Sequence, residues 1–223
     1  MIYKDFHYER LDLKKSKSIL NKIISDFKNA DSAKIQIEAI KEVDGFSREY
    51  MTYQAMASLN YSRDINDDFA KNEKDYYDSI SPDMREIYDR FDKALHQSKF
   101  KSEIIDMFGD TFLNQIEINL KTFDSKIKGM LKEEIELKNE YTKLTAGAKI
   151  EFEGKEYNLA GLGPFHSNVN RSVRKESYEA RFSWFKSNED ELDNIYDKLV
   201  NLRHKIAVTL GYNNFIELGY FRM

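Results

Sequence analysis

The chain has 223 residues, with 35 Lys and Arg against 39 Asp and Glu, a formal net charge of -4 and no cysteine. The near balance of charge argues against a nucleic-acid partner, because neutralising phosphates requires a basic surplus or a basic face. The absence of cysteine excludes disulfides, thiolate catalysis and cysteine-ligated zinc, and it makes the reducing cytoplasm the natural compartment.

Two prolines and nine glycines leave few interruptions in a chain that is rich in Lys, Glu, Leu and Ile. This composition favours long helices. We therefore predict an almost all-α fold, made mainly of long antiparallel helices. No stretch approaches the roughly 18 to 20 apolar residues of a membrane span, and the N-terminus lacks the apolar core of a signal peptide. We expect a soluble, cytoplasmic protein with no membrane partner.

The first half of the chain has the apolar spacing of successive helices. The first apolar face, at i, i+3, i+4 and i+7, consists of Leu20, Ile23, Ile24 and Phe27. Asp31 and Ser32 predict the start of a second helix that runs towards Tyr61. Ser81 followed by Pro82 predicts a new helix, because Ser is a favoured cap and Pro is pre-set for the first helical position. Further helices are expected near 101–107, 110–121 and 124–144.

One stretch, AGAKIEFEGKEYNLAGLGPF, departs from the helical pattern and predicts a β-hairpin near 148–159. With a two-residue loop, the facing pairs are Phe152 with Lys155, Glu151 with Glu156, and Ile150 with Tyr157. One face is then apolar. The face with two glutamates should lie in solvent or near a cation, since like charges opposite one another are destabilising. An isolated hairpin is marginal in water, so this one must lie on helices or against something outside the chain.

The helix expected at 169–186 carries the two residues with the clearest binding chemistry, Arg171 and Arg174. Two guanidinium groups three residues apart can clamp a carboxylate or backbone carbonyls. A salt-bridge role on the helix surface is the simpler alternative. The large aromatic residues of the same helix are expected to belong to the core: Tyr178, Phe182 and Phe185.

The chain closes with LGYNNFIELGYFRM, which follows a helix that Gly211 should terminate. From Phe215 onward, apolar residues occupy nearly every side of the expected last helix, and such a helix requires burial all round. We expect the sequence to stop before the packing partners of this helix. The residues predicted to form an exposed packing surface there are Phe215, Ile216, Leu218, Tyr220, Phe221 and Met223.

No reaction centre emerges from the residues themselves. The four histidines, which have no ligand-like spacing and are expected to be structural or on the surface, are His7, His96, His166 and His204. The chain has neither the strained Gly-x-Ser-x-Gly elbow of a serine hydrolase nor a phosphate-binding loop. We predict no catalytic residue, no metal ligand and no cofactor within this chain.

Five segments carry a family resemblance: YERLDL, FEGKEYNLAGL, NRSVRKESYEA, ELDNIYDKLVNLRHKIA and LGYNNFIELGYFRM. They resemble the amino-terminal portion of oligoendopeptidase F, within the thimet oligopeptidase-like zinc peptidases. The most specific of these segments lie after Asp124. The resemblance implies a neurolysin- or thimet oligopeptidase-like amino-terminal part, in a family whose helices form a bowl around a deep channel.

Members of this family bind zinc through a His-Glu-x-x-His motif and a later Glu in the carboxy-terminal half, and the motif's own Glu activates the attacking water. That motif is absent here, because the residues after the four histidines are Tyr8, Gln97, Ser167 and Lys205. The resemblance therefore implies an inactive fragment whose zinc belongs to a missing carboxy-terminal half. It also implies three regions: helices at 1–108, an oligopeptidase F amino-terminal-type region at 109–187, and the truncated start of the catalytic domain at 188–223.

Two hypotheses of different classes follow. In the first, the chain is the non-catalytic wall of a zinc metalloendopeptidase that cuts short peptides in a channel, with Tyr157, Arg171 and Arg174 lining or bracing that channel. Its partners would be short peptides and the missing catalytic half. In the alternative, the chain is a stand-alone helical module that binds a protein partner or self-associates through its last helix, without enzymatic activity.

Overall fold

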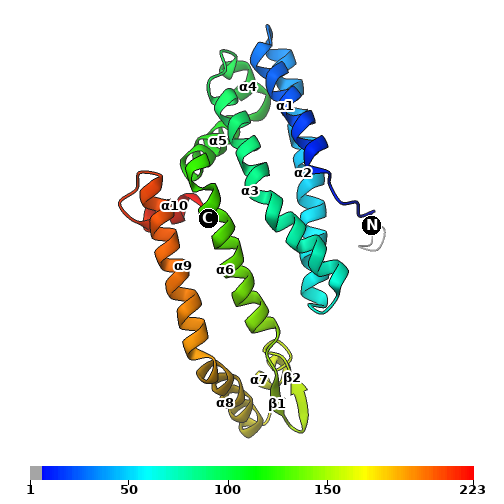
Figure 1. Cartoon of the computed structure of the whole chain (residues 1–223), viewed down its shortest axis with the longest axis vertical. Helices are drawn as coiled ribbons and strands as arrows, with labels where there is room; N and C mark the ends of the chain where they lie inside the picture. Colours follow the sequence, from blue (N-terminus) through cyan, green and yellow to red (C-terminus); the bar gives the residue numbers. More distant parts are fainter. Residues whose placement is uncertain (1–6) are drawn as a thin grey trace. The chain divides into compact units, whose positions relative to one another are not determined.

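The computed structural model describes residues 7–223, whose regular secondary structure consists of helices and one two-stranded hairpin (Figure 1). The elements in chain order are α1 Leu13–Asn29, α2 Ala33–Arg63, α3 Asp68–His96, α4 Lys101–Phe108, α5 Asp110–Thr122, the short 3-10 helix η2 Ser125–Ile127, α6 Lys128–Ala146, β1 Ile150–Phe152, β2 Lys155–Tyr157, α7 Gly163–His166, α8 Arg171–Ser187, α9 Glu189–Thr209 and α10 Phe215–Phe221. The predicted all-α fold with a small hairpin near 148–159 is confirmed. His7 is exposed and precedes the first helix.

The chain forms two compact units. The first contains the residues up to Lys132 together with His204–Met223, and the second contains Glu133–Arg203. Helices α6 and α9 therefore contribute to both units. The division expected from the sequence, at 1–108, 109–187 and 188–223, stays a prediction.

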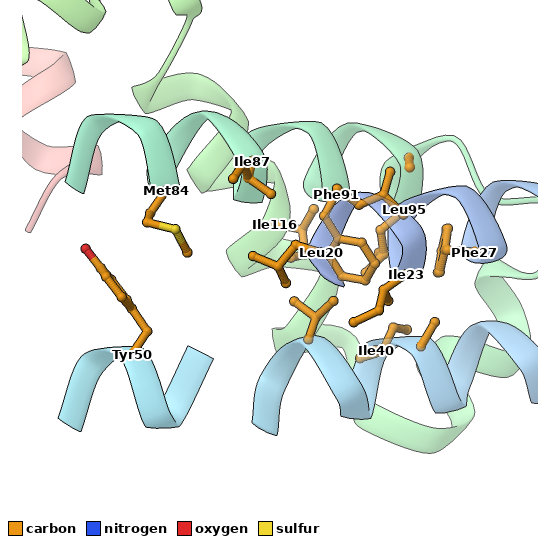
Figure 2. Packing of buried hydrophobic residues seen from close by; sticks show 14 of the residues in the cluster. Leu20, Ile23, Phe27, Ile40, Tyr50, Met84, Ile87, Phe91, Leu95 and Ile116 are labelled. Carbon is orange, nitrogen blue, oxygen red and sulfur yellow. The ribbon is translucent and has the colours of Figure 1, made fainter. Parts of the chain in front are cut away.

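The core of the first unit lies where α1, α2, α3 and α5 pack together. Figure 2 shows side chains from these helices pointing toward one another around Leu20, Phe27, Ile40, Phe91, Leu95 and Ile116. The rings of Phe27 and Phe91 meet edge to face with centroids 5.2 Å apart. The apolar face predicted for α1 is buried in this core, and each such large side chain contributes roughly 1.5 to 3 kcal/mol of transfer free energy.

Helix α3 corrects one sequence prediction, because it continues through Pro82 instead of starting there. Proline has no N–H to donate to the carbonyl four residues earlier, which here belongs to Asp78. The hydroxyl of Ser81 donates to that carbonyl oxygen at 3.2 Å. Ser81 thus replaces a backbone donor inside the helix rather than capping a new one, and Pro82 is buried among the apolar residues of α3.

A set of side chains on α3 holds the segment before α1, and we call these contacts the N-terminal clasp. Tyr77, fully buried, accepts a hydrogen bond at its hydroxyl from the backbone N–H of Leu11 at 3.1 Å. Glu73 is buried and accepts hydrogen bonds from the hydroxyl of Tyr8 and from Nε of Arg10, the latter at 2.9 Å. The hydrogen bonds from Arg10 hold the pKa of Glu73 below its usual value. The clasp joins residues more than 60 positions apart, so it closes only when the first unit folds.

Candidate functional site

The hairpin of the second unit has the predicted register, with Ile150 opposite Tyr157 and Phe152 opposite Lys155. Both loop residues have positive φ, 47° at Glu153 and 73° at Gly154, as a two-residue turn of the type that matches strand twist requires. The hairpin is the local frame on which the predicted site residue Tyr157 is placed.

The apolar face of the hairpin rests on α7 and α8, as its marginal stability in isolation demands. Phe152 and Leu162 are buried, and the ring of Phe165 meets Phe152 at 4.9 Å between centroids. Tyr157 is half-buried and meets the same Phe165 ring edge to face at 5.2 Å. Tyr157 therefore packs into this small core with one side and reaches solvent with the other.

The opposite face of the hairpin is solvated. Glu151 and Glu156 are both exposed, and the Nζ of Lys149 lies 3.7 Å from Oε1 of Glu156. This is the placement expected for two facing carboxylates, since solvent and a nearby cation reduce their repulsion.

The two candidate arginines of α8 do different things. Arg174 donates from Nη1 to the carbonyl oxygens of Asn168 at 2.6 Å and Val169 at 3.0 Å, which fastens the loop before α8 to the helix itself. Arg171 is exposed at the first position of α8 and forms no hydrogen bond or ion pair with residues 7–223. The structure therefore does not bring the two guanidinium groups together on one acceptor, and only Arg174 has a contact of the bracing kind.

Aromatic side chains on α7 and α8 form a stack that the sequence did not predict. His166 lies face to face with Tyr178 at 4.2 Å between centroids and 15° between planes, and Tyr178 continues to Phe182 at 6.4 Å and 18°. Tyr178 and Phe182 are 46% and 63% exposed, so the expectation that they belong to the core is wrong. Tyr178 and Phe182 lie four positions apart on the outside of α8, whereas Ser177 is buried and Ala180 packs against the hairpin core. The buried face of α8 is therefore offset from its aromatic face.

An apolar groove of about 690 Å³ runs between α6 and α9 within the second unit. Its apolar lining includes Tyr141 from α6 and Leu192, Tyr196 and Leu199 from α9. Arg203 of α9 also lines the groove, and its Nε donates a hydrogen bond to the buried Glu134 of α6 at 2.8 Å. This ion pair holds the two helices together, while Tyr196 leaves 70% of its surface in solvent.

The last helix, α10, packs on α5 with one face only. Leu218 is fully buried, so its assignment to an exposed packing surface is corrected. The hydroxyl of Tyr212 donates to the carbonyl of Lys121 at 2.9 Å, and the Nζ of Lys121 lies over the Phe221 ring at 4.8 Å from its centroid. These contacts give the helix a partner within the first unit that apolar periodicity alone did not reveal.

The outer face of α10 remains apolar and open. Ile216, Tyr220 and Met223 are 68%, 73% and 98% exposed, whereas Phe215 and Phe221 are half-buried. Burial all round, as expected from the sequence, is therefore not observed for this helix.

Nowhere in residues 7–223 do three His, Asp or Glu side chains converge in the way that a metal ion requires. The described residues therefore do not fit the zinc ion that the family resemblance implies. No helix in the same span has the length and apolar character needed to cross a bilayer.

A family model described as the Peptidase M3 N-terminal domain matches residues 3–123. The chain belongs to the M3 peptidase family. The resemblance inferred from the motifs is thereby confirmed, although the matched region is the part of the chain before Asp124, where those motifs are least specific.

Three solved structures are similar over nearly all of the M3 chain described above. A 3.1 Å X-ray structure of a proposed oligoendopeptidase F has a TM-score of 0.94 and 39% identity, covering 100% of this chain and 39% of that one. PZ peptidase A with an inhibitor has a TM-score of 0.94 and 38% identity, covering 99% and 39%. A proposed oligoendopeptidase F from Bacillus anthracis str. Ames has a TM-score of 0.93 and 35% identity, covering 99% and 40%.

The M3 chain thus spans about two fifths of the length of these structures. Curated proteins yield no significant match.

Proposed function

We propose that these residues act as the non-catalytic amino-terminal region of a zinc metallo-oligoendopeptidase, which hydrolyses short peptides inside a channel. The observation that carries the proposal is the match to peptidase structures over 99% or more of this chain at 35% to 39% identity, while only 39% to 40% of those chains is covered. The sequence also contains no His-Glu-x-x-His. We infer that zinc and the catalytic glutamate belong to polypeptide outside these residues, and that these residues alone cleave nothing.

The role of this region is to exclude folded substrates. Long packed helices with buried cores are rigid, so a wall built from them limits the width of what passes. In the second unit, the hairpin and α8 form a small core of their own, and Arg174 locks the loop between α7 and α8. We propose that Tyr157 and Arg174 brace this wall and that the exposed Arg171 faces the channel, where its guanidinium attracts peptide carboxylates.

A chimera tests the proposal. These 223 residues replace the matching part of the Bacillus anthracis protein, and the product is assayed with a quenched fluorescent peptide and with a stably folded protein. We expect cleavage of the short peptide that stops on zinc chelation, little cleavage of the folded protein, and no activity from the 223 residues alone. A folded, zinc-loaded chimera without peptidase activity would contradict the proposal.

Two variants of the chimera distinguish a residue that lines the channel from a residue that braces the wall. Arg171→Ala should raise KM for peptides with an acidic residue and leave the melting temperature unchanged, because Arg171 is exposed and forms no hydrogen bond or ion pair with a described residue. Arg174→Ala should lower the melting temperature, because two carbonyls lose a charged donor. If both variants changed KM for these peptides equally, Arg171 could not be assigned to the channel and Arg174 to the wall on this basis.

The exposed face of α10 favours a second candidate function, self-association or binding of a protein partner without activity. Ile216, Tyr220 and Met223 present apolar surface that association would remove from water at roughly 25 cal/mol per Å². Sedimentation velocity over a range of concentrations tests this candidate. We expect association that weakens in the double variant Ile216→Ser, Tyr220→Ser, and a concentration-independent monomer would count against it.

A further inference from the structure

Arg85 on α3 is a half-buried cation whose guanidinium is held by neutral groups. Its Nη2 donates to the carbonyl oxygen of Asn119 and to Oγ1 of Thr122, both at 3.0 Å, and its guanidinium lies 5.7 Å from the centroid of the Phe123 ring. All three partners lie at the end of α5 or just beyond it. These contacts fix the position of the guanidinium but contribute no negative charge.

No carboxylate of residues 7–223 forms an ion pair with Arg85. Asp89 and Asp92 attract it from a greater distance, yet burial prevails and lowers the pKa of Arg85 below its usual value. Partial removal of a cation from water is also costly when no charge partner is close. Arg85 therefore carries a positive charge that no carboxylate in direct contact balances.

A second cation faces the same place. Arg222, just beyond the end of α10, lines with Arg85 a pocket of about 360 Å³, and its charge acts unfavourably on Arg85. The amide side chains of Gln115 and Asn119 and the hydroxyl of Thr122 lie in the same lining, so neutral polar groups accompany the two guanidinium groups. Two cations held beside one pocket repel each other, and an anion between them reverses the sign of that interaction.

We propose that the pocket between Arg85 and Arg222 binds a small oxyanion, with a carboxylate as its preferred form. Guanidinium groups bind carboxylates through paired, charge-assisted hydrogen bonds, and this geometry favours a planar two-oxygen group over a monatomic anion. The pocket is near the lower limit of small-molecule sites, which suits a short dicarboxylate or a single carboxylate side chain. The site lies wholly in the first unit and does not depend on the proposed peptidase role.

Titration calorimetry of the 223-residue chain with succinate, acetate and inorganic phosphate, at constant ionic strength, tests the site. We expect saturable binding that is tighter for succinate than for chloride controls. The melting temperature should rise with succinate concentration, because a ligand that binds only the folded state stabilises it. Binding of phosphate alone would keep the anion site but overturn the carboxylate preference.

The variants locate the binding. Arg222→Gln, at an exposed position, should weaken succinate binding by about tenfold or more, since a charged hydrogen-bonded pair is lost. Arg85→Gln should do the same, and Arg222→Gln decides the matter if Arg85→Gln does not fold. The matched control is Arg48→Gln, an exposed arginine of α2 that pairs with Asp44 and should bind as the parent chain does.

Met223 lines the pocket too, so its terminal carboxylate is a competing source of the same chemistry. A version extended by two glycines moves that carboxylate away. If only the extended version binds succinate, the terminal carboxylate of Met223 occupies the pocket in the 223-residue chain, and the proposed carboxylate site is supported. If neither version binds any of the three anions, or if Arg222→Gln and Arg48→Gln bind equally well, the proposal is overturned.

Discussion

Replacing Tyr77 by Phe would remove a single hydroxyl from the N-terminal clasp. In the folded chain that hydroxyl accepts the backbone N–H of Leu11 at 3.1 Å, and Tyr77 is only 1% exposed. The variant keeps the ring and therefore creates almost no cavity, but it leaves a buried backbone donor without its acceptor. Such a loss costs about 1 to 3 kcal/mol. For a chain of this size that corresponds to a fall in melting temperature of roughly 2 to 12 °C.

Urea denaturation followed by circular dichroism measures the change in free energy, and amide hydrogen exchange at Leu11 locates it. We expect both the unfolding midpoint and the protection of the Leu11 amide to fall in Tyr77→Phe. The matched control is Tyr53→Phe on α2, whose hydroxyl donates to Glu49 at an exposed position. That variant should stay within about 0.5 kcal/mol of the parent chain.

The two measurements answer different questions. A lower midpoint with unchanged protection at Leu11 would mean that Tyr77 stabilises α3 without holding the N-terminal segment. If Tyr77→Phe matches Tyr53→Phe in both measurements, the hydroxyl is not the partner of the Leu11 amide, and the reasoning about the clasp is refuted.

Three further predictions concern other parts of the chain. Burial raises the pKa of Asp92 from 3.8 to about 6, so the ionised form is disfavoured in the fold. The free energy of unfolding therefore falls as pH rises between these two values. In urea titrations, Asp92→Asn should be more stable than the parent by about 2 to 3 kcal/mol at pH 8 and equal to it near pH 4. Phe152→Ala should cost about 3 to 5 kcal/mol and speed hydrogen exchange in the hairpin and α8 but not in α1. Ser81→Ala should lower the free energy of unfolding by about 1 kcal/mol in the parent chain, because the Asp78 carbonyl loses its hydroxyl donor. In a chain that already carries Pro82→Ala it should cost almost nothing, because the new backbone N–H at position 82 donates to the same carbonyl. Additive costs in this double-mutant cycle would contradict the idea that the Ser81 hydroxyl replaces the missing N–H of Pro82.

The hairpin shows what sequence alone can determine. Its register, its two-residue loop and the solvated Glu151–Glu156 face all follow from residues within ten positions of one another. The alternation of side chains has a period of two, so a slip by one residue would expose Ile150 and Phe152. Gly154 tolerates the positive φ that the loop requires. Local constraints of this kind leave one solution.

Ser81–Pro82 and α10 show where local rules fail. Ser before Pro is a good start for a helix, but the same pair can also stay inside a helix when the serine hydroxyl takes over the missing hydrogen bond, and tertiary packing of Pro82 decides between the two. The apolar composition of α10 indicates that partners are needed without saying which face they cover. Only the contact with α5 shows that Leu218 is the buried residue.

The same reasoning explains why the sequence singled out Arg171 and Arg174 but passed over Arg85. The spacing of the first two makes a pair visible in the sequence, yet in the fold one braces its own loop and the other is solvated. Arg85 has no visible pattern, because its acceptors lie 34 and 37 residues away. Both acceptors belong to α5, which meets α3 only in the folded first unit. An unbalanced charge is a property of the assembled core, and the residues most able to bind an anion are therefore the ones that periodicity is least able to identify.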